Sequence, residues 1–283
     1  MKKIFLLLLA LFLVTGCSLT KDNLEDAKIY TTIYPIAYLT ESLYGDYGTI
    51  ESIYPTGADV TTYELTEKQI KNYAKADLFI YNGLSNEKNT TKNLINQNKN
   101  LLIIDVSYGL SYNKKIEELW MSPNNYLMLA KNIKDNLIEY LSSKYIIENV
   151  EKKYEELAEI LSLMDADLRA IGKEAKEKGK NTLVVNSDLF YYLENYGFNI
   201  ISLDPDSVTE TTMNNMKSAF NKKTYTSLIV LDEINSEDIK SIVEENNIST
   251  INISSMIHND PDKGDYVMQM QAFIDSIQNL TLN

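Results

Sequence analysis

A long stretch near the middle of the chain constrains the fold more than any other feature of the sequence. From about position 144 to about 176, apolar residues recur at intervals of four and three, as they do along one face of an α-helix. A helix of this length extends about 50 Å at about 1.5 Å per residue, which is longer than one small lobe. Its apolar stripe consists of Val150, Tyr154, Leu157, Leu161, Met164, Leu168 and Ile171. We expect this helix to pack along two lobes of one chain, and the alternative is the seam of a coiled-coil dimer, because Glu and Lys flank the stripe.

Strand-like and helix-like segments alternate on both sides of this stretch. Before it, strands are predicted over 28–34, 48–54, 77–81 and 101–106, and helices over 35–45 and 66–75. The second helix opens with Thr66 and Gln69 at the spacing of a capping box. After the long helix, strands are predicted over 182–185, 198–203, 227–231 and 249–253, and helices over 188–196, 211–220, 236–246 and 266–280. The predicted fold class is therefore α/β, with two (βα)4-type lobes whose parallel sheets are joined by one long spanning helix.

The N-terminus has the order of features that directs a protein out of the cell. Two lysines precede an apolar run from Ile4 to Val14, which is too short to cross a bilayer as a helix. The run leads into Val14-Thr15-Gly16-Cys17, which resembles the bacterial lipobox. Cys17 is the only cysteine and has no disulfide partner, so acylation also removes a reactive thiol. We predict a signal peptide over 1–16, a lipid anchor at Cys17, and an extracytoplasmic protein attached to the cell membrane.

Composition excludes several functions. The chain has 283 residues and a formal net charge of −13, and such an acidic surface repels nucleic acid. His258 is the single histidine and lies among loop-type residues, so no base for an activated nucleophile is visible. No glycine-rich nucleotide-binding string is present in the sequence. We therefore expect a protein that is not an enzyme.

We expect a polar tether over 17–27, an N-terminal lobe over 28–122, a helical region over 123–180 and a C-terminal lobe over 181–283.

Several strings resemble one family in the correct order, namely the zinc and manganese solute-binding lipoproteins of bacterial ABC importers. Pro55–Asp59, followed by Tyr63-Glu64, resembles the family's Pro-x-Gly-Ala-Asp-Pro-His-x-Tyr-Glu loop. Glu118–Pro123 resembles its His-x-Trp-Leu-x-Pro string, and Asn186–Phe190 its Ser-His-x-x-Phe string. Further matches are Tyr30–Ile36 at the first strand and helix start and Ala76–Gly83 at a second strand. The resemblance extends over most of residues 28 to 280 and implies two lobes that face each other across a crevice.

The resemblance also locates the family's metal ligands, which are three histidines and a carboxylate. The corresponding positions hold Thr61, Glu118, Ser187 and, near the last strand, Ser254. Hydroxyl groups are poor ligands for a divalent ion at neutral pH, so the ligand set for zinc is absent. Further residues expected near the crevice are Tyr63, Glu64, Asp188, Asp232 and Glu233. A divalent metal such as zinc or manganese is thus implied by resemblance but is not supported by these residues.

Three interpretations of function remain open. The first is a receptor that delivers a metal ion to the permease of an importer of the zinc and manganese type, with an all-oxygen site favouring manganese, magnesium or calcium. The second is a related receptor whose altered cleft binds a non-metal or chelated solute. The third is a surface protein that acts by contact. The expected partners are the permease and, through acylated Cys17, the lipid bilayer, with no nucleic acid and with the chain as a monomer.

Overall fold

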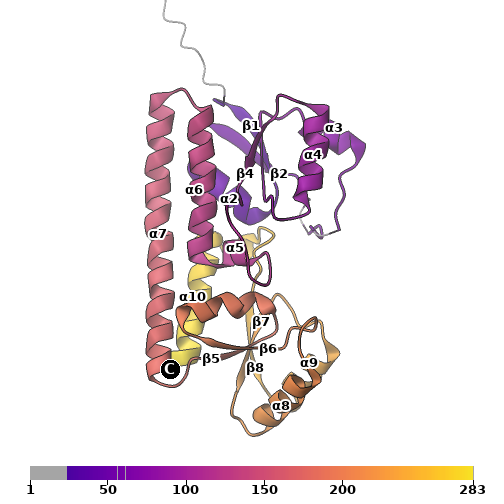
Figure 1. Cartoon of the computed structure of the whole chain (residues 1–283), viewed down its shortest axis with the longest axis vertical. Helices are drawn as coiled ribbons and strands as arrows, with labels where there is room; N and C mark the ends of the chain where they lie inside the picture. The colour runs from indigo at the N-terminus through magenta and orange to yellow at the C-terminus, as the bar shows by residue number, and fades with distance from the viewer. Residues whose placement is uncertain (1–23, 56, 61, 283) are drawn as a thin grey trace, which may run out of the picture.

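The computed structural model describes residues 24–55, 57–60 and 62–282, which form two α/β lobes one above the other (Figure 1). Each lobe holds a four-stranded sheet in which all paired strands are parallel. The first sheet contains β1 (Ala27–Thr31), β2 (Gly48–Ser52), β3 (Leu78–Tyr81) and β4 (Leu102–Asp105). The second contains β5 (Thr182–Val185), β6 (Asn199–Ser202), β7 (Ser227–Leu231) and β8 (Ser249–Ile253). The predicted fold class is confirmed.

The two sheets share one strand order, which places a crevice at a defined edge of each. The orders are β2-β1-β3-β4 and β6-β5-β7-β8. In the first sheet the buried Ile29 on β1 lies opposite Ile50 on β2 and Leu78 on β3. From β1 the chain first forms β2 on one side of β1 and then crosses to form β3 on the opposite side of β1, so the direction in which strands are added reverses between β1 and β3. In sheets of this kind, ligands bind outside the carboxyl ends of the strands at that reversal. The ends of β1 and β3 are therefore the expected position of a site.

Helices cover the sheets and fill the space between the lobes. The α-helices are α2 (Tyr34–Tyr44), α3 (Glu67–Tyr73), α4 (Glu87–Gln97), α5 (Glu118–Met121), α6 (Pro123–Tyr140), α7 (Lys144–Glu177), α8 (Glu210–Asn221), α9 (Glu237–Glu245) and α10 (Tyr266–Leu282). The helix predicted over 188–196 is the 3₁₀ helix η2 (Asp188–Tyr196), and η3 (Pro261–Lys263) is another 3₁₀ turn. The capping box is present, because Thr66 Oγ1 accepts from the Gln69 N–H and Gln69 Oε1 accepts from the Thr66 N–H. Within the described ranges, every helix is too short or too polar to traverse a lipid bilayer.

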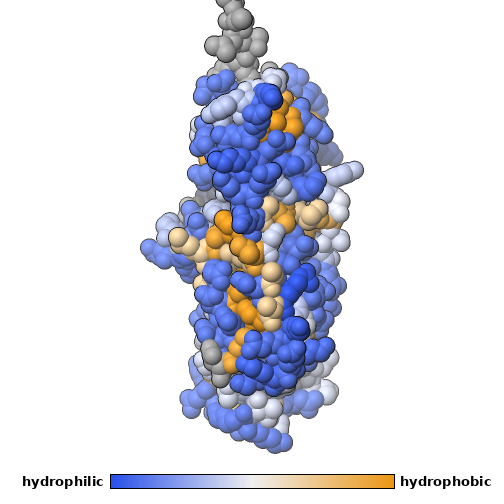
Figure 2. Space-filling model, turned by 90° about the vertical axis from the view of Figure 1, so that its left-hand side faces the viewer, coloured by the Kyte–Doolittle hydropathy of each residue, from blue (hydrophilic) through white to orange (hydrophobic). Residues whose placement is uncertain are grey.

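The long helix α7 has 34 residues and runs beside both lobes (Figure 1). It packs against α6 and α2 along the first lobe and against α10 along the second. Its predicted stripe is buried within the chain except for Tyr154, which is partly buried, and Val150, Leu161 and Leu168 are fully inaccessible to solvent. Intramolecular packing therefore accounts for the stripe without a coiled-coil partner. The outer face is mainly hydrophilic, with a narrow apolar band below the middle of the molecule (Figure 2).

Gly172 allows α7 to approach the second lobe closely. A Cβ atom at this position would lie 1.9 Å from the carbonyl oxygen of Tyr196, at the end of η2. Tyr196 also donates its hydroxyl hydrogen to Asp165 Oδ1 at 2.7 Å, about two turns earlier on α7 than Gly172. The guanidinium of Arg169 lies over the Tyr196 ring at 5.0 Å. The end of η2 is thereby fixed to the spanning helix.

The packed part of the chain begins earlier than the sequence predicts. Leu24 and Ala27 are buried, although both lie in the segment 17–27 that was predicted as a polar tether. The Leu24 carbonyl accepts the hydroxyl hydrogen of Tyr44 at 3.1 Å, and the Asp26 N–H donates to the Tyr47 carbonyl at 2.8 Å. The first strand begins at Ala27, one residue before the predicted start. The predicted signal peptide and Cys17 lie outside the described residues.

Candidate solute-binding cleft

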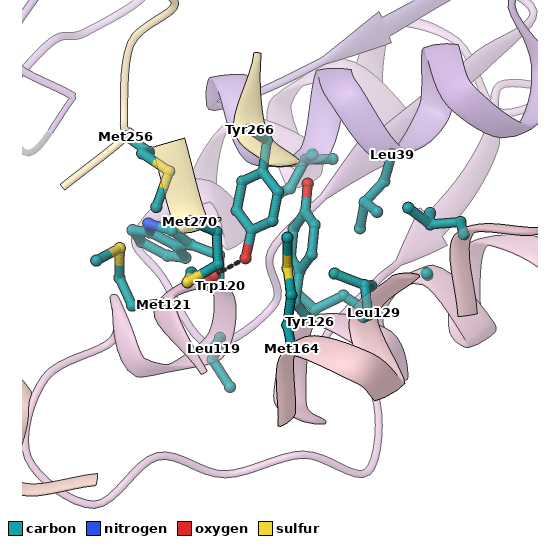
Figure 3. Packing of buried hydrophobic residues seen from close by; sticks show 14 of the residues in the cluster. Leu39, Leu119, Trp120, Met121, Tyr126, Leu129, Met164, Met256, Tyr266 and Met270 are labelled. Carbon is teal, nitrogen blue, oxygen red and sulfur yellow. Dashed lines mark hydrogen bonds between the residues drawn. The ribbon is translucent and has the colours of Figure 1, made fainter. Parts of the chain in front are cut away.

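The lobes meet through aromatic side chains around Trp120, which is 3% exposed (Figure 3). Its indole Nε1–H donates to the Ser255 carbonyl at 2.8 Å, which joins α5 to the loop after β8. The Tyr266 hydroxyl, from α10, donates to the Trp120 carbonyl. Tyr126 stacks on Tyr266 with ring centroids 3.8 Å apart and donates its hydroxyl hydrogen to the Pro35 carbonyl at 2.7 Å. The side of Trp120 that faces Tyr126 and Tyr266 is thus filled by rings.

Burial keeps these two tyrosines protonated. Burial away from solvent is the main cause that raises the pKa of Tyr126 and of Tyr266 well above the usual value, and the proximity of other tyrosines is the second cause. Both hydroxyl groups are therefore donors at every pH at which the protein is expected to work. Met121, Met164, Met256 and Met270 pack around the rings (Figure 3). Flexible thioether side chains fill irregular spaces beside aromatic groups well.

Glu118 lies at the start of α5 and is 8% exposed. Its Oε2 accepts a hydrogen bond from the Asn113 N–H at 2.9 Å, and its carbonyl accepts from Asn125 Nδ2 at 3.3 Å. Its neighbours Glu117 and Trp120 line a cavity of about 390 Å³. The Glu118 carboxylate therefore stabilises the turn before α5 in this structure.

Ser187 and Asp188 stabilise the start of η2, which packs against α5. Ser187 Oγ accepts from the Leu189 N–H at 3.2 Å. Asp188 Oδ1 accepts from the Ser207 hydroxyl at 2.9 Å, and the Asp188 N–H donates to Asp204 Oδ2 at 2.9 Å. Like Glu118, both side chains thus have local structural partners.

Asp232, Glu233 and Ser254 lie together in a cavity of about 520 Å³ between the ends of β7 and β8 and helix α10. Asp232 adopts a left-handed backbone conformation, with φ 54°. Its Oδ1 accepts from the Ser255 N–H at 2.8 Å, and Ser254 Oγ accepts from the Met256 N–H at 3.1 Å. Asp232 and Ser254 thus shape the loop that carries Trp120's hydrogen-bond partner.

Tyr63 and Glu64 line a different cavity, of about 670 Å³, beside α3 and α4. The Tyr63 hydroxyl accepts from Gln69 Nε2 at 2.7 Å. Thr61, the first position implied by the resemblance, lies outside the described residues. The expected residues are therefore distributed over the α5–η2 contact and two separate cavities. His258, expected in a loop, follows β8 and lines a small cavity of about 200 Å³.

The sequence reasoning missed an ion pair that connects the lobes. Lys115 Nζ lies 3.3 Å from Asp204 Oδ2 and 3.4 Å from Asp206 Oδ2, so the segment before α5 is held to the loop after β6. Burial of Asp204 opposes its charge, but the N–H groups of Asp188 and Asp206 and the Lys115 ammonium together lower its pKa. Burial likewise opposes the charge of Lys115, and the two aspartates outweigh this and raise its pKa. A fixed cation thus already connects the two lobes.

Glu87, at the first turn of α4, was also missed. It is 5% exposed, and its Oε2 accepts from the Asn82 N–H at 2.8 Å. Burial raises the pKa of Glu87 to about 7, although the Asn82 N–H favours the ionised form. The nearby Thr32 hydroxyl also lowers the pKa of Glu87. Within the described residues, this hydroxyl is buried and has no hydrogen-bond partner at ordinary distance and angle. The signal in the sequence was a Glu shortly after the Asn82-Gly83 end of a buried strand.

The donor set does not fit a tightly bound zinc ion. Among residues 24–55, 57–60 and 62–282, no group of three or more His, Cys, Asp or Glu side chains is arranged to hold a metal. The positions that the resemblance assigns to ligands hold hydroxyl groups apart from Glu118, whose carboxylate already accepts a backbone hydrogen bond. Neutral hydroxyls bind divalent ions weakly.

The fold defines a class of proteins with two α/β lobes, each built on a parallel sheet, and one helix that spans both lobes. Residues 29–280 match the family described as zinc-uptake complex component A, periplasmic. The chain belongs to this family of solute-binding transport proteins. Residues 1–18 match the lipid attachment site of prokaryotic membrane lipoproteins. The protein is therefore extracytoplasmic and anchored at the membrane through its N-terminus.

Relatives cover nearly the whole chain. A manganese ABC transporter substrate-binding lipoprotein of Streptococcus gordonii is 28% identical, over 96% of this chain and 96% of the relative. A metal ABC transporter substrate-binding lipoprotein of Lactococcus lactis is 26% identical, over 96% and 95%. The solved structure of the metal-dependent lipoprotein YcdH from Bacillus subtilis aligns with a TM-score of 0.74 at 21% identity, over 91% of this chain and 100% of that one. This structural likeness supports the fold.

Proposed function

We propose that the chain is the solute-binding lipoprotein of an ABC importer of the zinc and manganese type, and that it passes its solute to a membrane permease. The observation that carries this proposal is the family match over residues 29–280, together with relatives named as substrate-binding lipoproteins. The acidic surface and the lipid anchor suit a receptor held at the outer face of the membrane. We propose that the receptor acts as a monomer and has no catalytic role.

The solute is the part of the function on which this chain departs from its relatives. The ligand positions implied by resemblance offer one carboxylate and hydroxyl groups instead of imidazoles. We therefore expect a solute recognised by hydrogen bonds rather than a bare zinc ion. The Lys115–Asp204 ion pair supports this view, because a cation between the lobes is already supplied by the chain.

We expect the lobes to move little between the bare and loaded states. One long helix packs on both lobes, and the core that contains Trp120 and Tyr266 continues from one lobe into the other. A hinge would have to break this packing. Small-angle scattering of the bare and loaded protein tests the expectation, and a large decrease in the radius of gyration on loading would contradict it.

Native mass spectrometry of the protein purified without chelator, paired with calorimetry against zinc, manganese and calcium, tests the solute. We expect no stoichiometric zinc, and a mass increment of an organic molecule would support the altered cleft. Stoichiometric zinc would show that the ligand positions are wrongly assigned. Cross-linking to the permease in membranes tests the receptor role itself, and absence of any cross-linked permease would contradict it.

A second experiment restores the family's imidazoles. The triple variant Thr61→His, Glu118→His and Ser187→His should bind zinc far more tightly than the parent chain, because imidazole nitrogen is a good ligand for zinc. The matched control places three histidines at exposed positions of α7 that are too far apart to share an ion, at Glu155, Asp167 and Lys173. Equal zinc affinity in both variants would mean that the three positions do not converge.

A further inference from the structure

A cavity of about 390 Å³ lies at the strand reversal of the first sheet. It is bordered by Ile33 after β1 and by Asn82 after β3, which are the strands between which the chain changes direction. Trp120 and, from the second lobe, Ile257 also line it. The volume falls within the range of about 300–1,000 Å³ that small-molecule sites occupy. Its place matches the position at which open parallel sheets bind ligands.

A buried acid and a buried amide lie side by side in the lining of this cavity. Glu87 is 5% exposed and Asn82 is 2% exposed, and the Glu87 carboxylate accepts the Asn82 backbone N–H at 2.8 Å. Asn82 Oδ1 is used by the Leu84 N–H at 3.0 Å, which fixes the orientation of the side-chain amide. Asn82 Nδ2 donates to no group in the described part of the chain. The lining therefore presents a carboxylate acceptor next to an unused N–H donor.

A lysine at the rim adds positive charge. Lys114 lines the cavity, and its Nζ lies 5.3 Å from the centre of the Tyr191 ring. No carboxylate of the described residues forms an ion pair with Lys114, whereas the adjacent Lys115 is held by Asp204 and Asp206. Lys114 is thus the cation available to an anionic group in the cavity.

Apolar side chains provide the remaining walls. Ile33 and Trp120 are almost fully buried, and the partly exposed Ile257 faces the same space from the second lobe. Such walls favour an apolar substituent, whereas the polar groups fix the orientation of a ligand. A bare ion would leave most of the cavity unfilled.

We propose that this cavity binds a small zwitterion of the α-amino acid class. Its ammonium group pairs with Glu87, its carboxylate accepts from Asn82 Nδ2 and faces Lys114, and its side chain lies against Trp120 and Ile33. An α-amino acid carries its cation and its anion on one carbon atom, which matches an acceptor and a donor that are neighbours. This assignment rests on the proposed receptor function, because it names the solute that the receptor carries.

Calorimetry with the full-length lipoprotein in detergent and each of the twenty common L-amino acids tests the assignment. We expect at least one to bind saturably with one site per chain. For that amino acid, the analogue without the amino group and the analogue without the carboxylate should each bind about tenfold or more weakly, since a hydrogen bond to a charged group changes affinity by at least this factor. Absence of saturable binding by all twenty would overturn the assignment.

Variants then locate the bound molecule. Glu87→Gln keeps the shape of the side chain and should weaken binding at least about tenfold, and Lys114→Met, at an exposed residue, should weaken it severalfold. Lys92→Met on α4 is the matched control and should leave affinity unchanged. If Glu87→Gln and Lys114→Met both bind the amino acid with the affinity of the parent chain, the amino acid lies elsewhere and the assignment is overturned. If one variant folds poorly, the other still provides this test.

The outcomes separate this assignment from the receptor function. Stoichiometric manganese or zinc without amino acid binding, in a protein that still cross-links to the permease, would overturn only the zwitterion assignment. A protein that binds neither ligand class and cross-links to no permease would overturn both.

Discussion

Replacement of Glu87 by glutamine should change how the stability of the protein depends on pH. Glu87 has a pKa of about 7 in the folded chain, mainly because burial disfavours its charge, against an ordinary value of 4.5. A proton bound more tightly by the folded state stabilises that state, so this contribution is fully present below about pH 4.5 and is lost as the pH rises to about 7. At about 1.4 kcal/mol for each pH unit between the two pKa values, the loss amounts to about 3 kcal/mol. Asp105 contributes in the same direction, as a smaller cause.

The glutamine side chain retains an acceptor for the Asn82 N–H but has no proton to lose. We therefore expect Glu87→Gln and the parent chain to have similar free energies of unfolding at pH 4.5, and the variant to be more stable by up to about 3 kcal/mol at pH 8. Urea unfolding followed by circular dichroism between these pH values measures the difference. Glu155→Gln, at an exposed position of α7, should run parallel to the parent chain. A difference for Glu87→Gln that stays constant with pH, or a variant that is less stable at pH 8, would refute a raised pKa at this residue.

Three further substitutions probe contacts that hold the lobes and the spanning helix together, each followed by urea unfolding. Lys115→Met leaves Asp204 buried without its cation and should lower the free energy of unfolding by about 1–3 kcal/mol, and unchanged stability would contradict a bridging role. Gly172→Ala puts a methyl group against the Tyr196 carbonyl and should cost about 1–3 kcal/mol, whereas alanine stabilises an ordinary helix site, so a gain would contradict the close approach. Trp120→Phe keeps an aromatic ring but removes the donor to the Ser255 carbonyl, and it should lower the free energy of unfolding by about 1–3 kcal/mol. A decrease below about 1 kcal/mol would show that water replaces the indole N–H.

The architecture was predictable because its signals are periodic and local. The stripe of α7 repeats every three or four residues, so its spacing predicted a long amphipathic helix, whereas its packing partners α6, α2 and α10 came from the fold. The strands were visible as short apolar runs, and the capping box at Thr66 marked the start of α3. Alternation of strands and helices then fixed the parallel sheets, because only crossovers of this kind connect parallel strands.

The site was less predictable because its groups interact over long sequence distances. The ion pair between Lys115 and Asp204 joins residues 89 positions apart, and neither residue type is unusual for its place in the sequence. No helix was predicted around Glu87, and only the fold reveals that this residue begins α4 and is 5% exposed beside a cavity. The expectation that Glu118, Ser254 and Tyr63 share one crevice came from resemblance, which transfers positions but not side-chain orientations. In the structure Ser254 and Tyr63 line two separate cavities, and the Glu118 carboxylate accepts a backbone hydrogen bond from Asn113.

The early start of the packed chain at Leu24 limits how far the molecule can travel from the bilayer. The seven steps from Cys17 to Leu24 span at most about 25 Å when fully extended. Leu24 enters the first lobe beside Tyr44, so that lobe stays close to the lipid surface while the second extends outward (Figure 1). The tether therefore limits the height above the membrane that the strand ends bordering the 390 Å³ cavity can reach. Encounter with a permease becomes a lateral search in two dimensions, whose rate depends on the surface density of receptors.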